Sequence, residues 1–115
     1  MSSADPCYVA RMDQPSPYTA EDRQRWRTTL LAKGGAVAAM LEELLANKEV
    51  DLAKLELKMV DDEKEPKEKR LRRYFDLLMA RMRSVDHPRF GFDPKTGSFL
   101  TVAALDEMPW AECEP

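Results

Sequence analysis

The stretch Thr19–Ala46, TAEDRQRWRTTLLAKGGAVAAMLEELLA, decides the fold of this 115-residue chain. Its apolar residues recur at three- and four-residue steps, which is the spacing of one face of an α-helix. Thr19 and Asp22 resemble a capping box with Asp in place of Glu, so we expect the helix to begin at Thr19. The face expected to be buried consists of Trp26, Leu30, Gly34, Val37, Leu41, Leu44 and Leu45.

A helix over this stretch would be roughly 40 Å long, at about 1.5 Å per residue, whereas the mean globular helix has ~11 residues. Such a length is typical of a projecting helical hairpin. Gly34 and Gly35 lie in its middle, where each glycine costs about 1 kcal/mol relative to alanine. We therefore expect either a close-packed partner helix or a bend at this point.

A second amphipathic helix is predicted over Glu68–Val85, EKRLRRYFDLLMARMRSV. Its apolar positions follow at steps of four, three, four and three residues. The two helices predict a mainly α fold built on a long antiparallel helical hairpin, or coiled coil, over residues 19–85. The apolar positions of the second helix are Leu71, Phe75, Leu78, Met82 and Val85. Trp26 of the first helix and Phe75 of the second are candidates for the core between them.

The polar residues 47–51 predict the turn between the helices, because Asn47 is suited to ending one helix and Asp51 to capping the next. We place the hairpin tip near residues 47–53. Residues 52–60 fit either a strand or a helix, and their lack of β-branched residues before Val60 favours a helix. Pro66 predicts a kink or a restart before the second helix.

After Val85 the pattern changes to that of a small globule, residues 86–115. Asp93, Pro94 and Gly97 suit a tight turn between two short strands, and residues 103–107 suit one helical turn. The apolar cluster expected here is Phe90, Phe92, Phe99, Leu100 and Trp110. Residues 1–18 contain three prolines and predict a loosely ordered arm, on which Tyr8 and Val9 are the residues able to dock.

Composition and charge exclude several classes of protein. Lys and Arg number 18 against 21 Asp and Glu, a net charge of −3, which argues against direct, sequence-independent nucleic-acid binding. The longest apolar stretch, Gly34–Leu41, is too short to span a bilayer, and no signal-peptide run is present, so we expect a cytoplasmic protein without a membrane role. Cys7 and Cys113 alone form neither a disulfide scaffold nor a four-cysteine zinc site.

The residues needed for catalysis are largely missing. His87 is the only histidine, and no serine or cysteine stands in a nucleophile context, so we expect neither an enzyme nor a cofactor. The acid pairs Glu42-Glu43 and Asp61-Asp62 are most simply solvated faces. Five arginines make the second helix basic, either as a phosphate-facing surface or as a solvated face: Arg70, Arg72, Arg73, Arg81 and Arg83.

The segment Phe90–Ala111 resembles the zinc-finger end of the DksA/TraR family, transcription factors that insert a helical hairpin into the secondary channel of bacterial RNA polymerase. The family order is an aromatic-Gly-aromatic run, Cys-x-x-Cys-Gly, then Leu-Glu-x-x-Pro-x-Ala. This chain keeps Phe90-Gly91-Phe92, Gly97, Leu100, Leu105-Asp106 and Pro109-Trp110-Ala111 at the same spacing. Asp93 and Thr96 stand at the two cysteine positions, so the resemblance is to a zinc-independent member.

The resemblance implies that the hairpin tip enters the polymerase, with RNA polymerase as partner and no direct DNA contact. Asp51-Leu52-Ala53 matches the second half of the family's Asp-x-x-Asp-x-Ala tip, with Lys48 at the first Asp position and Glu49 beside it. Asp51 would then be the acidic group near the polymerase active centre. By itself, Asp51 also suits a helix cap.

The implied polymerase-contact surface is Arg70, Arg72 and Arg73. Family members that respond to the alarmone ppGpp carry basic groups near the zinc end, whereas Met108 precedes Pro109 here and no basic residue follows Lys95, so alarmone dependence is not expected. The alternative hypothesis is a helical-hairpin adaptor or a dimerising interaction module unrelated to transcription.

Overall fold

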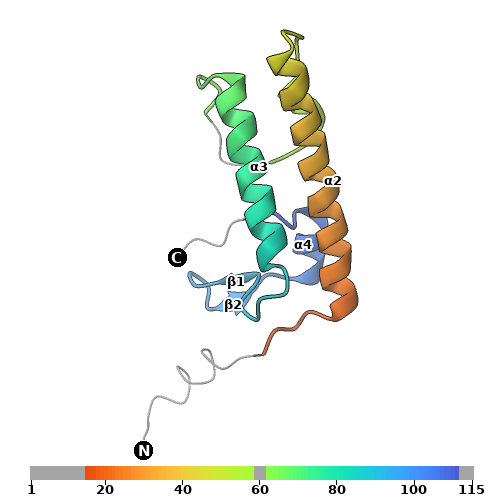
Figure 1. Ribbon diagram of the computed structural model, residues 1–115. Coiled ribbons are helices and arrows are strands. Elements are labelled where there is room, and N and C mark those ends of the chain that lie inside the picture. The colour runs from red at the N-terminus through yellow and green to blue at the C-terminus, as the bar shows by residue number, and fades with distance from the viewer. Residues whose placement is uncertain (1–14, 59–61, 112–115) are drawn as a thin grey trace, which may run out of the picture.

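The computed structural model describes residues 15–58 and 62–111, which form a mainly helical, elongated molecule (Figure 1). Two antiparallel helices lie side by side, α2 (Ala20–Leu45) and α3 (Lys67–Ser84) (Figure 1). One end of this hairpin carries a globule of β1 (Phe92–Asp93), β2 (Ser98–Phe99) and α4 (Val102–Glu107). The connector between the helices contains a short 3-10 helix, η1 (Leu52–Leu55). The expected hairpin with a small C-terminal globule is confirmed.

The start of α2 is the predicted capping box. The Asp22 amide donates to Thr19 Oγ1 over 3.0 Å, and the Thr19 amide donates to Asp22 Oδ2 over the same distance. Glu21 and Asp22 also place negative charge in the first turn, where the helix dipole favours it. At the other helix, Pro66 is the residue before α3, so the predicted restart occurs there.

An apolar seam joins α2 to α3. Leu30 and Val37 of α2 pack with Leu71 and Leu78 of α3, and all four are fully buried. Tyr74 is also buried in this seam, whereas the predicted core residue Phe75 is only half-buried beside it. The prediction for Leu45 was wrong, since its side chain is 54% exposed at the end of α2, beyond the reach of the seam.

The two central glycines have different surroundings. A Cβ atom at Gly34 would collide with the Met79 methyl group of α3, so this glycine permits close packing of the two helices. Gly35 is exposed, and a Cβ atom there would meet nothing within 4 Å. The close partner helix is confirmed at Gly34, and α2 runs through both glycines without a break.

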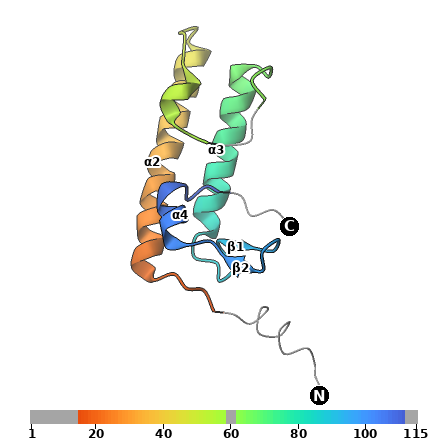
Figure 2. The same cartoon turned by 180° about the vertical axis from the view of Figure 1, so that it is seen from behind.

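The connector between α2 and α3 does not form the simple turn that was predicted at the hairpin tip. Among the described residues of the connector, Leu52–Leu55 alone form a helix, and it is a 3-10 turn that ends at Glu56, whose φ is +53°. Residues 52–58 then run back along the hairpin instead of remaining at its end (Figure 2). Residues 59 and 60, the rest of the predicted helix, lie outside the described residues.

Three contacts hold the connector against the hairpin. Leu55 is buried in the seam, and its carbonyl accepts a 2.8 Å hydrogen bond from Lys33 Nζ. The Lys58 carbonyl accepts a 3.3 Å bond from Trp110 Nε1. Trp110 therefore belongs to the seam and not to the predicted globule cluster, because its indole closes the space between the connector and α2.

A second cluster forms where the hairpin meets the globule. Trp26 and Val85 from the hairpin pack with Phe90 and Leu105 from the globule. Tyr18 joins them at 7% exposure, and its hydroxyl donates to the Leu100 carbonyl over 2.7 Å. The expected arm therefore does not extend to residue 18. Residues 1–14, including Tyr8 and Val9, lie outside the described residues.

Hydrogen bonds to one carboxylate lock α4 onto α2. Asp106 Oδ1 accepts from Trp26 Nε1 over 2.8 Å and from Arg25 Nε over 2.9 Å. The hydrogen bond from Trp26, followed by that from Arg25, holds the pKa of Asp106 below its ordinary value. Arg25 also bonds to Asp22 in the first turn of α2, so a single network joins the helix start to the globule.

The predicted β-hairpin is present. Phe92 pairs with Phe99 and Asp93 with Ser98 in an antiparallel register. The turn closes through the Gly97 amide, which donates to the Asp93 carbonyl over 2.8 Å, and Gly97 takes a φ of +72° that favours glycine.

Gly35→Ala is expected to stabilise the protein by about 1 kcal/mol, because the exposed helix interior gains propensity and the new methyl meets nothing. Gly34→Ala is expected to gain less, because Met79 must move aside. Urea unfolding of both variants measures the difference. Equal gains would contradict the close packing at Gly34.

Asp106→Asn is expected to lower the Tm at neutral pH, since Asn keeps an acceptor for Trp26 but loses the charge. The folded pKa of Asp106 lies below 3.8, so its ionised form stabilises the fold above that pH and the benefit disappears as the pH falls further. Thermal unfolding from pH 7 to 2.5, about the range where carboxylates titrate, should show the two proteins converging in acid.

The control is Glu107→Gln, which neutralises the neighbouring exposed carboxylate 3.9 Å from Lys58 Nζ and should change the Tm little. A gap between the Asp106 variant and the wild type that is constant with pH would refute the role of the charge.

Candidate functional site

The free end of the hairpin lies opposite the globule, and it begins with the capped end of α2. The Asn47 amide donates to the Leu44 carbonyl and the Lys48 amide to the Glu43 carbonyl, each over 3.0 Å. Asn47 has a φ of +65°. These features form a Schellman motif, which ends the helix sharply and fixes the direction of the following turn.

The turn after Asn47 is anchored by one residue and exposed at the others. Val50 is buried at 8% exposure, and its carbonyl accepts a 2.7 Å hydrogen bond from Lys67 Nζ, at the first residue of α3. Lys48 and Glu49, two of the predicted tip residues, are exposed beside it. The start of α3 therefore holds the turn while its charged side chains face solvent.

Asp51 combines a structural contact with exposure. Its Oδ1 accepts a 3.0 Å hydrogen bond from the Ala53 amide, which caps η1. Among the described residues, Oδ2 has no hydrogen-bond donor. Asp51 and Ala53 are both exposed, so the cap fixes the carboxylate without hiding it.

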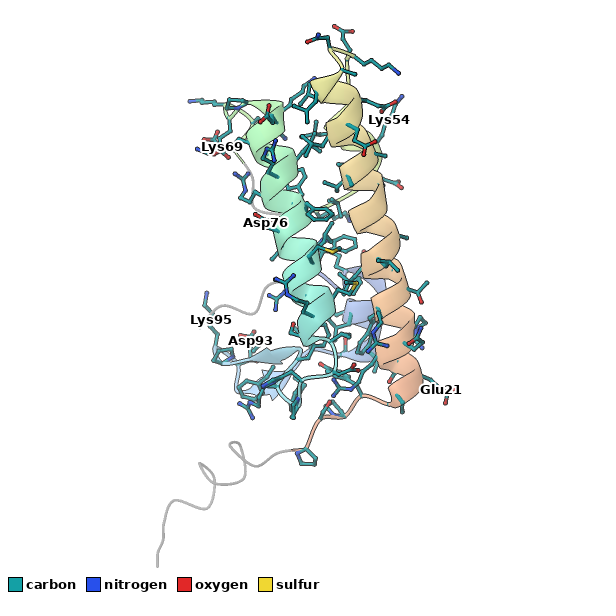
Figure 3. All side chains as sticks on the ribbon, in the orientation of Figure 1. Glu21, Lys54, Lys69, Asp76, Asp93 and Lys95 are labelled. Atoms are coloured by element: carbon teal, nitrogen blue, oxygen red, sulfur yellow. The ribbon has the colours of Figure 1, made fainter. Side chains whose placement is uncertain are left out.

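The three predicted contact arginines have different partners among the described residues. Arg72 pairs with Glu68 one turn earlier on α3, over 3.2 Å. Arg73 pairs with Glu65, and hydrogen bonds from Arg73 and then Lys69 hold the pKa of Glu65 below its ordinary value. The Arg70 guanidinium instead donates to the Tyr74 hydroxyl over 3.3 Å. Figure 3 shows Lys69 near the free end of the hairpin, with Asp93 and Lys95 at the opposite end.

A hollow of about 810 Å³ lies between the connector and the start of α3. The described residues that line it include Asp51, Ala53 and Arg70, so the structure brings these three predicted residues to one place. Lys48, Glu49, Arg72 and Arg73 are not among those lining residues. The other lining residues are Leu52, Leu57, Asp62, Glu63, Lys64, Lys67 and Tyr74.

Three acidic and three basic residues are among the described residues that line this hollow, which suits hydrogen bonds and ion pairs to a protein partner of mixed charge. Lys67 and Tyr74 are among the site residues that the sequence analysis missed. Pro66 offered a signal for Lys67, because it marks the start of the helix, but no local pattern indicated that the Lys67 ammonium group reaches the Val50 carbonyl.

At the globule, hydrogen bonds occupy the positions of the family's first cysteine pair. The Lys95 amide donates to Asp93 Oδ1 over 3.0 Å, and Thr96 Oγ1 lies 3.1 Å from Ser98 Oγ. Within residues 15–58 and 62–111, no group of three or more His, Cys, Asp or Glu side chains is placed to hold a metal ion. Cys7 and Cys113 lie outside the described residues.

No described helix is both long and apolar enough to cross a membrane. Comparison of the chain with models of protein families, with curated proteins and with solved structures finds no match. The resemblance to the DksA/TraR family therefore rests on the spacing of residues 90–111 and on the hairpin that precedes them.

Proposed function

We propose that this chain is a transcription regulator that binds bacterial RNA polymerase through protein contacts, with the free end of its hairpin in the secondary channel. It acts without catalysis, without a cofactor and without direct DNA binding. The DksA/TraR-like spacing of the globule motivates the choice of partner. Cytoplasmic localisation is part of this proposal, because the polymerase is there.

One observation carries the proposal: an exposed carboxylate is fixed at the free end of a hairpin that projects from a small base. The Asp51 cap to the Ala53 amide and the Lys67 bond to the Val50 carbonyl orient this end. The two long helices lie side by side and give the described part of the chain an elongated shape (Figure 1). A rod with an ordered charged end suits insertion into a channel.

The charges near the free end suit the same role. The Arg72–Glu68 and Arg73–Glu65 pairs involve partly exposed side chains. Such surface pairs contribute only about 0–1 kcal/mol each, so their arginines are able to exchange an internal carboxylate for one on a partner. Asp51 would then act on mobile elements near the polymerase active centre through its negative charge, without forming a covalent bond.

A second candidate function is a helical adaptor or dimerising module, and the outer face of α2 favours it. Leu31 is 58% exposed there. Its exposed neighbours on this face carry no charge: Thr28, Ala32, Gly35, Ala36 and Ala39. Gly35 leaves room for another helix to approach, which an adaptor would use instead of the free end.

Asp51→Asn separates the two functions. Asn keeps a side-chain oxygen for the Ala53 amide, since Asn and Asp are comparable helix caps, so the fold should be retained. We expect unchanged affinity for core RNA polymerase, within about twofold, and loss of the effect on initiation by about tenfold or more. The measurements are binding to labelled polymerase and single-round transcription, each challenged with a known secondary-channel binder.

The matched control is Asp76→Asn, which removes an exposed carboxylate from the middle of α3, away from the free end (Figure 3). This variant should behave as wild type in both assays. Absence of wild-type binding at micromolar concentration would refute the polymerase proposal and favour the adaptor. Binding with an Asp51→Asn variant as active as wild type would refute the role of Asp51.

A further inference from the structure

One side of α2 is not covered by any other described element (Figure 1 and Figure 2). The large apolar side chains exposed on the described surface are Leu31, at 58%, and Leu45, at 54%. Their positions differ by two heptads, so both leucines lie on the same side of the helix. The contacts within the chain therefore leave two leucines of one helix face open to a partner.

Two places on this face have the form that receives such a side chain. A shallow hollow of about 650 Å³ lies near the start of α2. With Ala20, it is lined by four residues at the spacing i, i+3, i+4 and i+7: Glu21, Gln24, Arg25 and Thr28. Four residues at this spacing form the hole that accepts a knob from a facing helix in a coiled coil. The second such set has small side chains at its centre: Gly35, Ala38, Ala39 and Glu42.

An antiparallel second copy of α2 places both leucines in these holes in a single register. When the two helices cross at Gly35, Leu31 of each copy lies over Ala38 and Ala39 of the other. In the same register Leu45 of each copy lies over the hollow near the start of the other helix. Gly35 permits the crossing, because a Cβ atom there would meet nothing within 4 Å. The face is therefore complementary to itself, as two-fold symmetry requires.

The charges along α2 favour the antiparallel orientation. From residue 23 onward, every basic residue of α2 precedes Gly35, namely Arg23, Arg25, Arg27 and Lys33. The acidic residues of this stretch, Glu42 and Glu43, follow Gly35 and are exposed. Arg25 and Arg27 keep 47% and 32% of their side chains exposed beside their internal ion pairs. An antiparallel copy brings acidic ends beside basic ends, whereas a parallel copy sets like charges together.

We propose that this face of α2 binds a second copy of the chain, as an antiparallel two-fold dimer centred at Gly35. The inference rests on the second candidate function, the dimerising module, and does not involve the polymerase. One helix face makes a contact at the small end of protein interfaces, so the expected dissociation constant is about 10 to 100 μM. Since the dimer covers α2 along its length, self-association competes with insertion of the hairpin into a channel.

Sedimentation velocity of the full chain, from about 5 to 500 μM, measures the self-association. We expect a reversible change from monomer to dimer over this range. Leu31→Gln should weaken the dimer by about tenfold or more, because it removes the apolar knob at the centre of the contact. The control is Ala80→Gln, at an exposed position of α3, which should behave as wild type. Circular dichroism checks that each variant keeps its helices.

A pair of substitutions at Thr28 tests the register. Thr28 is exposed, and in the proposed dimer it lies beside Glu42 of the other copy. Thr28→Lys should therefore tighten the dimer and Thr28→Glu should weaken it, each by about threefold. Adding Glu42→Lys to Thr28→Glu should restore the wild-type dissociation constant. In a parallel dimer Thr28 lies beside its own counterpart, so both single variants would weaken it.

Three results would overturn the proposal. A chain that stays monomeric at about 500 μM leaves this face to a different protein. Equal weakening by Thr28→Lys and Thr28→Glu contradicts the antiparallel register. A dimer that Leu31→Gln leaves unchanged uses another surface. No polymerase is present in these measurements, so their failure is distinct from a failure of the polymerase proposal.

Discussion

The whole arrangement depends on the apolar seam between α2 and α3. Leu30 and Val37 on one helix meet Leu71 and Leu78 on the other, and Gly34 lets the helices approach. A two-helix hairpin buries only one face of each helix, and here the connector and Trp110 cover the seam from outside. Without this cover, the two helices would leave apolar surface exposed along their length. The seam therefore holds the two helices, the connector and Trp110 together as one packed unit.

The base of the hairpin and its free end are held by different kinds of contact. At the base, Trp26 and Asp106 lock the globule onto α2, and Tyr18 closes the cluster from the N-terminal side. At the free end, fewer apolar contacts are available, and backbone caps do the positioning through Asn47, Asp51 and Lys67. A partner would therefore meet an ordered end that carries charged side chains together with the exposed Leu45. This division is consistent with docking through protein contacts.

Local sequence patterns were sufficient to predict the helices and turns, but they were insufficient to predict the contacts between residues distant in sequence. The capping box at Thr19, the restart after Pro66 and the turn at Gly97 each depend on neighbouring residues, and each was predictable. The path of residues 52–58 was not, because it depends on contacts with residues distant in sequence, Lys33 and Trp110. For the same reason Asp51 was recognisable as a cap, whereas the hollow that it shares with Arg70 required the structure.

Site-specific photocrosslinking tests the central claim, that the free end engages RNA polymerase, most directly. A photoreactive residue replaces Lys48 at the free end or Lys95 at the globule, both of which are exposed. The account predicts that the probe at position 48 crosslinks to core RNA polymerase and that a secondary-channel binder abolishes the crosslink. Crosslinks from position 95 alone, or crosslinks from position 48 that the competitor leaves unchanged, would contradict it.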